Sequence, residues 1–175
     1  MMSDGKTGKG ATAMAKTEFV IKPGVQEITM IREFDAPRDV VFQVMMDPNA
    51  IPKWWGPRAY STKVDKMDAR SGGSWRFING DDKGNEYGFR GVYHLVEPNH
   101  VIQTFEFEGV PGRPALETMT LEDIGGRTRM VQHSVFLSLE DRDGMVQSGM
   151  QGGAEETNDR LAELVAERLK DKRGG

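Results

Sequence analysis

The chain has 175 residues, a length that predicts a single domain with its own hydrophobic core. It contains no cysteine, which excludes disulfide frameworks, thiolate zinc sites and cysteine nucleophiles and favours a reducing, cytoplasmic location. With 23 basic and 27 acidic residues, the formal net charge of -4 argues against a nucleic-acid partner, and no apolar run is long enough to cross a membrane.

The first residues of the chain are rich in glycine, lysine, threonine and alanine and lack the apolar segment of a secretory signal. We expect residues 1–24 to form a disordered leader, in which Glu18–Ile21 is a candidate for a short extended segment before the break at Pro23-Gly24. The folded domain is then expected over residues 25–170, followed by a frayed tail over residues 171–175.

The folded domain is predicted to begin with a strand and a helix. Residues Gln26–Phe34 alternate apolar and polar side chains, which is typical of a strand with one buried face. Asp35-Ala-Pro37 follows and gives an acidic N-cap and a proline in the first turn of a helix. The apolar stripe of this helix is formed by Val40, Val41, Val44 and Met45.

Two adjacent tryptophans, Trp54 and Trp55, are predicted to lie on a second, shorter helix. Asp47-Pro48 can cap its beginning and Gly56-Pro57 stops it, while Ile51 shares an apolar stripe with both indoles. Neighbouring residues of a helix point about 100° apart, so the two indoles cannot fill the same space. We therefore expect the two tryptophans to have different roles.

Six strand-like segments follow, separated by short runs of glycine, proline, asparagine and aspartate. They are Tyr60–Asp68, Gly73–Asn79, Glu86–Glu97, Val101–Glu108, Ala115–Asp123 and Thr128–Leu137. No helical pattern separates them, so we predict consecutive antiparallel hairpins rather than parallel β-α-β units.

The last third of the chain returns to a helical pattern, which we expect to form one helix from about Gly144 to Lys170. Its apolar stripe is formed by Leu161, Leu164, Val165 and Leu169. Three glycines, Gly149, Gly152 and Gly153, weaken its first half by about 1 kcal/mol each relative to alanine. They suit either a movable gate or a frayed helix start, and the sequence leaves both interpretations open.

Together these elements predict an α+β fold. A curved antiparallel sheet of seven strands is expected to wrap around the long C-terminal helix, with two short helices after the first strand. The terminal helix is the one long amphipathic element that can cover the apolar face of the sheet. Because a curved sheet and a single helix do not fill the space between them completely, we expect an apolar hollow there.

A set of motifs spans most of the chain. They are Arg32-Glu-Phe-Asp-Ala-Pro37 with Val41-Phe42, Trp54-Trp-Gly-Pro57, Asp68 with Gly72-Gly-Ser-Trp-Arg-Phe77, Gly91-Val-Tyr93 with Glu97-Pro98, and Glu156-Thr-Asn-Asp-Arg-Leu161. Through them residues 26–169 resemble the START-like, or helix-grip, superfamily (SRPBCC), and within it the family of the activator of heat shock protein 90 ATPase homologue. The resemblance implies a helix-grip fold with an apolar internal cavity, in a superfamily of ligand carriers, polyketide cyclases and chaperone activators.

The same resemblance implies a bulky apolar residue early in the last helix, where this chain has Ala154. A small side chain at this position would either enlarge the hollow or let the helix and the sheet approach more closely. Both outcomes are compatible with the sequence.

Few residues suggest catalysis or metal binding. The three histidines, His94, His100 and His133, lack ligand spacing, and no nucleophile elbow, phosphate-binding loop or dinucleotide motif occurs. We therefore assign no catalytic residue, no metal and no cofactor. An enzyme of the cyclase or hydrolase type would need a polar pair inside the cavity, drawn from Tyr87, Tyr93, His94 and Arg90. Arg76 and Arg90 are expected in surface salt bridges.

Aromatic and methionine side chains alternate onto one face of the predicted strands and supply the candidates for ligand binding. The cavity candidates are Trp55, Trp75, Phe77, Tyr87, Phe89, Tyr93, Phe105, Phe107, Met119, Met145 and Met150. Trp54 is predicted to be a core anchor beneath the terminal helix, and Trp55 to lie at the cavity mouth. A simple packed core explains most of these residues, whereas aromatic walls with a few polar groups are typical of small-molecule pockets.

We therefore predict a monomer or weak homodimer that binds a small, largely apolar molecule, as a carrier, sensor or stress-related accessory protein. Two alternatives remain open. One is a protein-interaction module that activates a chaperone ATPase, which predicts an exposed apolar patch. The other is an enzyme of the polyketide cyclase or hydrolase type.

Overall fold

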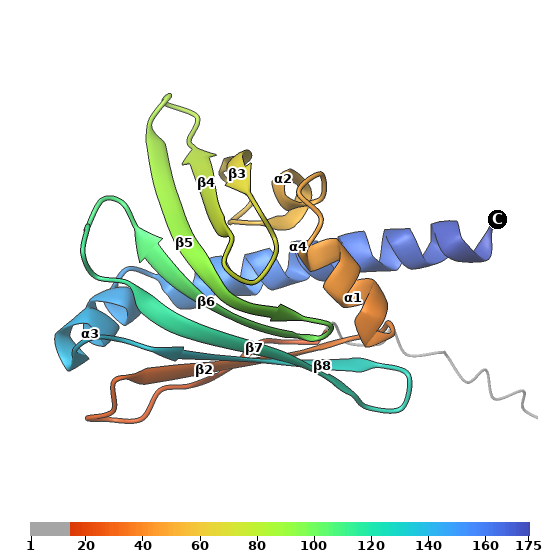
Figure 1. The fold of residues 1–175 in the computed structure, drawn as a ribbon, viewed down its shortest axis with the longest axis horizontal. Coiled ribbons are helices and arrows are strands. Elements are labelled where there is room, and N and C mark those ends of the chain that lie inside the picture. Colours follow the sequence, from red (N-terminus) through yellow and green to blue (C-terminus); the bar gives the residue numbers. More distant parts are fainter. Residues whose placement is uncertain (1–14) are drawn as a thin grey trace, which may run out of the picture.

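The computed structural model describes residues 15–175, which form one antiparallel sheet and four helices (Figure 1). The strands are β1 (Glu18–Val20), β2 (Glu27–Phe34), β3 (Ser61–Met67), β4 (Ser74–Gly80), β5 (Glu86–Glu97), β6 (His100–Phe107), β7 (Ala115–Asp123) and β8 (Thr128–Val135). The helices are α1 (Arg38–Met45), α2 (Ile51–Trp54), α3 (Leu139–Gln147) and α4 (Met150–Arg173). No helix in this part of the chain is both long and apolar enough to span a membrane.

The strands lie in the order β1-β2-β8-β7-β6-β5-β4-β3. From β3 to β8 each strand pairs with the next one along the chain, as the short turns between them predicted. The first long strand, β2, pairs with β8, with Glu27 opposite Val135 and Phe34 opposite Thr128. An α+β fold with an open antiparallel sheet and a long C-terminal helix is confirmed.

The sheet has eight strands, and the predicted number of seven is wrong. The additional strand, β1, lies inside the segment that we expected to be a disordered leader, and pairs Phe19 with Met30 along the outer side of β2. It coincides with Glu18–Ile21, the part of the leader that we named as a candidate extended segment, although three residues are too few for alternation to identify a strand of the sheet. The first part of the expected leader, residues 1–14, lies outside the described residues.

The C-terminal helical region is divided, which corrects the single helix expected from about Gly144 to Lys170. Ser138 caps the N-terminus of α3, because its Oγ accepts a hydrogen bond from the backbone N–H of Asp141, and the helix ends before Gly149. Gly149 adopts a left-handed conformation with φ of 83°, which separates α3 from α4. Helix α4 continues to Arg173, so most of the tail expected to be frayed over residues 171–175 is helical.

Helix α4 runs along the inner side of the curved sheet, and α1 and α2 pack beside it (Figure 1). Its predicted stripe residues Leu161, Leu164 and Val165 are buried in the main core. A buried arginine of β2 attaches the helix to the sheet: Arg32, only 1% exposed, bonds to Glu155 at 3.3 Å and to Asp159 at 2.9 Å. These contacts hold α4 at a fixed position relative to the sheet.

A cavity between the sheet and the C-terminal helices

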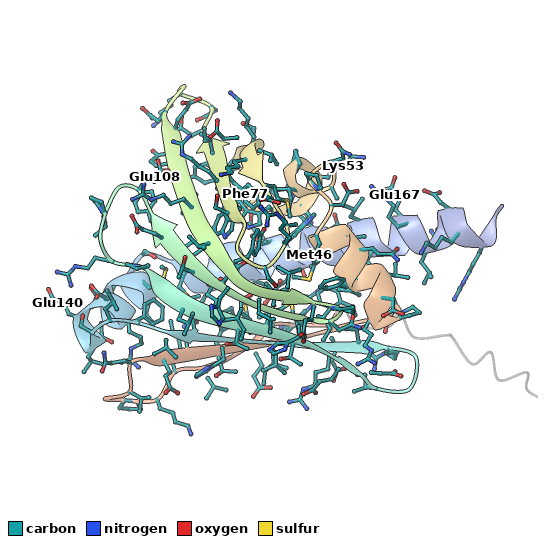
Figure 2. The ribbon with its side chains drawn as sticks, in the orientation of Figure 1. Met46, Lys53, Phe77, Glu108, Glu140 and Glu167 are labelled. Carbon is teal, nitrogen blue, oxygen red and sulfur yellow. The ribbon has the colours of Figure 1, made fainter. Side chains whose placement is uncertain are left out.

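The inner face of the sheet and the helices α2, α3 and α4 line a partly open cavity of about 1380 Å³. It is larger than the roughly 300–1,000 Å³ that is usual for small-molecule pockets. All eleven aromatic and methionine candidates from the sequence lie on its wall, and so does Ala154 of α4. In Figure 2, the labelled side chains of Phe77 and Met46 lie between the strands and the helices, and Glu140 lies at the α3 end.

One end of the cavity is aromatic, and Trp55 is at its centre. Its indole packs edge-on against Phe77 and Phe89, with ring centroids 5.2 Å apart in both pairs, and against Trp75 at 6.3 Å. Phe105 and Phe107 extend the same cluster along β6. The rings come from the residue after α2 and from β4, β5 and β6, so this end of the cavity is built by residues far apart in the sequence.

The two tryptophans differ in burial. Trp54, on α2, is 6% exposed and belongs to the main core, whereas Trp55 is half-buried and follows the last residue of the helix. Both line the cavity. Their different surroundings agree with the expectation that they do not fill the same space, while the roles of anchor and ligand contact stay predictions.

Gly91 on β5 makes room for the aromatic wall. A Cβ atom at this position would collide with the carbonyl oxygen of Thr104 and would lie 2.5 Å from Nε1 of Trp75. The absence of a side chain at Gly91 therefore allows the Trp75 indole to lie directly over β5.

The floor of the cavity carries a polar group that we did not predict, the carboxylate of Glu117 on β7. Gln103 Nε2 donates a hydrogen bond to one carboxylate oxygen at 3.0 Å, and Gln132 Nε2 donates to the other at 3.1 Å. Ser134, directly opposite Glu117 on β8, also favours the charged carboxylate. Register explains the grouping, because Gln103, Glu117 and Ser134 are opposite one another on β6, β7 and β8.

Burial raises the pKa of Glu117 to about 7, since the ionised carboxylate loses hydration in this surrounding, and the hydrogen bonds from Gln103, Gln132 and Ser134 counteract only part of the effect. The side chain keeps some accessible surface because it faces the hollow, although it lies deep in the protein. The sequence held one signal for this site. Glu117 lies at alternate positions with the buried Ala115, Met119 and Leu121, so its side chain points to the same face of β7. The alternation therefore predicts one acid on an otherwise apolar face.

Other titratable side chains on the cavity wall in the described part of the chain are Tyr60, Tyr87, Tyr93, Arg113, Glu140, Asp141 and Asp143. Arg113 bonds to Asp141 at 3.0 Å, and Asp143 bonds to Arg142 at 2.7 Å. Burial raises the pKa of Tyr93 above its usual range, with a smaller contribution from the charge of Asp68, so Tyr93 stays neutral.

The polar residues considered for an enzyme are only partly brought together. Tyr87 and Tyr93 line the cavity, and the Tyr87 hydroxyl donates to Asp81 at 3.3 Å. His94 and Arg90 are exposed and do not line it, and Arg90 pairs with Glu106 at 2.8 Å. Arg76 bonds through two nitrogens to Glu108, at 2.6 and 2.9 Å, so both arginines form the surface salt bridges that we expected.

The sequence model of a family described as "Activator of Hsp90 ATPase homolog 1-like protein" matches residues 35–166. No curated protein matches the chain at a significant level. Solved structures with the same fold include a protein from Arthrobacter aurescens, with 24% identity, a TM-score of 0.79 and coverage of 86% of this chain and 91% of that one. A protein from Rhodobacter sphaeroides has 22% identity, a TM-score of 0.79 and coverage of 86% and 98%.

A more distant likeness is to DynU16, described as a protein of the dynemicin biosynthetic locus. It has 19% identity and a TM-score of 0.60, and the alignment covers 81% of this chain and 47% of that one. At these levels of identity the solved structures establish the fold alone.

Proposed function

The chain belongs to the Activator of Hsp90 ATPase homolog 1-like family, and from the cavity inside its fold we propose that it binds a small, largely apolar molecule between the sheet and α4. The observation that carries this proposal is a hollow of about 1380 Å³ with walls of aromatic and methionine side chains. Protein interiors are normally packed as densely as organic crystals. A hollow of this size therefore favours a protein that encloses a guest over one that only maintains a core.

The wall is suited to an apolar guest of irregular shape. Aromatic rings at one end offer large, rigid contact surfaces, and the flexible thioethers of Met119, Met145 and Met150 can adapt to different ligand outlines. Burial of apolar surface would supply most of the binding free energy. The biological role that follows is that of a carrier, a sensor or a stress-related accessory protein.

A direct test uses Nile red, a neutral apolar dye, together with a variant that fills the cavity. Ala154 lies on the cavity wall, so Ala154→Phe would place a ring in the hollow. We expect wild-type protein to bind the dye with saturable fluorescence, and Ala154→Phe to weaken the binding by about tenfold or more. Ala166→Phe is the matched control, because Ala166 lies on the same helix but is exposed.

The dye experiment has a clear negative outcome. If wild-type protein shows no saturable binding, or if the two phenylalanine variants behave alike, ligand binding in this cavity is refuted. If the dye binds wild-type protein and only Ala154→Phe weakens the binding, native mass spectrometry of the protein purified from its own host would identify the natural ligand class, because a copurified molecule adds its mass to that of the chain.

A chaperone-directed role is the second candidate, since the family is described by activation of the Hsp90 ATPase. One surface observation favours it: Leu116 and Val135 are opposite each other on β7 and β8, both are exposed, and Leu137, two residues after Val135, is 62% exposed. Such neighbouring apolar side chains are typical of contact surfaces. Purified protein should then stimulate the chaperone's ATPase, and Leu116→Asp should abolish the stimulation but leave Nile red binding unchanged.

A further inference from the structure

The carboxylate of Glu117 has no basic partner in the cavity. Its two oxygens accept hydrogen bonds from the amides of Gln103 and Gln132, which are neutral. Among the lining residues in the described part of the chain, Arg113 is the only lysine or arginine, and it is bonded to Asp141. A buried carboxylate that keeps only neutral partners is costly when it is ionised. A positive charge from outside the protein, such as one on a ligand, would therefore be needed to stabilise Glu117 as an anion.

The rest of the cavity wall is also more acidic than basic. Asp141 is neutralised by Arg113 and Asp143 by Arg142, which leaves Glu117 and Glu140 as the acids on the wall with no ion pair to a described residue. An anionic ligand such as a fatty acid would bring a second negative charge into a low-dielectric space and would be repelled. A cationic ligand would be attracted.

We propose that the ligand of this cavity is an apolar molecule with a protonated amine, and that Glu117 binds this amine at the floor of the cavity. The inference rests on the proposed function, because it concerns the ligand of the same site.

The arrangement offers more than one acceptor to an ammonium group, which has three N–H donors. Gln103 and Gln132 bond to Glu117 through their nitrogens, and their amide oxygens accept no hydrogen bond from the described side chains. The amine would lie among these oxygens and the carboxylate. The apolar part of the ligand would extend toward the aromatic end around Trp55.

Proton exchange gives this binding mode a distinctive signature. The pKa of Glu117 is about 7 in the free protein, so a large part of the protein carries the proton slightly below neutral pH. A bound ammonium stabilises the carboxylate and lowers this pKa. The neighbours on β6 and β8, Gln103, Gln132 and Ser134, do not titrate in this range. The other titratable groups on the wall are Arg113, Glu140, Asp141, Asp143 and the three tyrosines. Amine uptake should therefore release a proton from Glu117.

The test compares three probes with the same alkyl chain, decylamine, decanol and decanoic acid, each in competition with Nile red. The alcohol is used below its solubility limit, and the two ionic probes are used below their critical micelle concentrations. In wild-type protein we expect the amine to bind about 10- to 100-fold more tightly than the alcohol, as for a hydrogen bond between charged groups, and the acid to bind most weakly. In Glu117→Gln the preference for the amine should be lost while the alcohol and the dye still bind. Glu122→Gln, on the exposed side of the same strand, should keep the wild-type order.

Calorimetry on the wild-type protein measures the release of the proton directly, and Glu117→Gln serves as its control. At about pH 6.5 the observed binding enthalpy of decylamine should depend on the ionisation enthalpy of the buffer, which reports proton release, and that of decanol should not. In Glu117→Gln the buffer dependence should vanish.

Two sets of results are distinguishable. If neither Nile red nor any probe binds, the proposed function fails. If Nile red and decanol bind, but wild-type protein shows no preference for the amine or no buffer dependence, the cavity takes an apolar ligand and only the amine inference is overturned. A preference for the amine that persists in Glu117→Gln also overturns it.

Discussion

Trp54 and Trp55 show how far a single residue's role can be predicted from its neighbours in the sequence. The spacing of the short helix placed both indoles on an apolar stripe, and the structure buries Trp54 in the core and leaves Trp55 half-buried among three other rings. The partners of Trp55 lie on β4 and β5. Helical spacing contains no information on which strands meet a helix, so those contacts could not be predicted.

We expect Trp54→Ala to reduce the free energy of unfolding by about 3–5 kcal/mol, as for other buried aromatic residues. Trp55→Ala should cost clearly less and should instead weaken Nile red binding, because it removes the ring at the centre of the aromatic end of the cavity. Urea unfolding and dye titration measure the two effects. Equal and large destabilisation by both substitutions would show that the pair is purely structural.

Glu117 makes the stability of the free protein depend on pH. Its pKa is about 7 in the folded protein, whereas a glutamate in an unfolded chain titrates near about pH 4.3. The folded state therefore binds the proton more tightly, and between these two values stability falls as the pH rises. Above about pH 7 the full penalty applies, on the order of 3 kcal/mol.

Glu117→Gln should remove this dependence. Relative to the wild type, the variant should gain stability from about pH 5 to about pH 8, up to the order of 3 kcal/mol, in urea unfolding at several pH values. Glu122→Gln, on the opposite face of β7, provides the baseline. Parallel pH profiles for wild type and Glu117→Gln would mean that the carboxylate titrates normally.

At the scale of elements, the alternation of apolar and polar residues and the positions of turn residues were sufficient to predict where the long strands begin and end. The predicted bounds of β5 and β7 agree with the structure, and those of the other long strands differ only at their ends. The helical region was less predictable. Gly149 was recognised as a weak point, but a glycine inside a helix and a left-handed glycine between two helices look alike in a sequence.

The division between α3 and α4 can be tested at that glycine. Gly149→Ala forces a side chain into the left-handed region and should cost about 1–2 kcal/mol. Gly152→Ala is the matched control, because Gly152 lies inside α4 with open space where the Cβ would be, and it should stabilise the protein by up to about 1 kcal/mol. Thermal unfolding followed by circular dichroism measures both. Stabilisation by Gly149→Ala would contradict a break at this residue.

At the scale of the whole molecule, the sequence predicted the fold class but not the long-range pairing that assembles it. The pairing of β2 with β8 joins residues about 100 positions apart, and the Glu117 cluster depends on the register of three strands. Amphipathic patterns identify which face of an element is buried, but they do not identify its partner. The cavity wall could therefore be foreseen as a set of side chains, and its polar floor could not.

The attachment of α4 to the sheet depends on Arg32, which joins β2 to two acids of the helix. Arg32→Ala leaves Glu155 and Asp159 without their buried cation and should reduce the free energy of unfolding by about 3 kcal/mol or more. Arg127→Ala removes an exposed arginine that also bonds to two acids, Glu33 and Asp35, and should have little effect. Equal losses of unfolding free energy for Arg32→Ala and Arg127→Ala would show that the burial of Arg32 does not determine its contribution to stability.

The pairing of β2 with β8 also has a consequence for the order of folding. Hairpins from β3 to β8 can form between neighbours in the chain, but β2 has to wait for the strand that is made last. During synthesis, β2 emerges early and its long edge stays without its main partner until residues up to Val135 have left the ribosome. Such non-local pairing is slow and leaves a strand edge open to wrong partners. Helix α4 follows β8 in the chain and leaves the ribosome later still, so the sheet side of the cavity is synthesised before the helix that covers it.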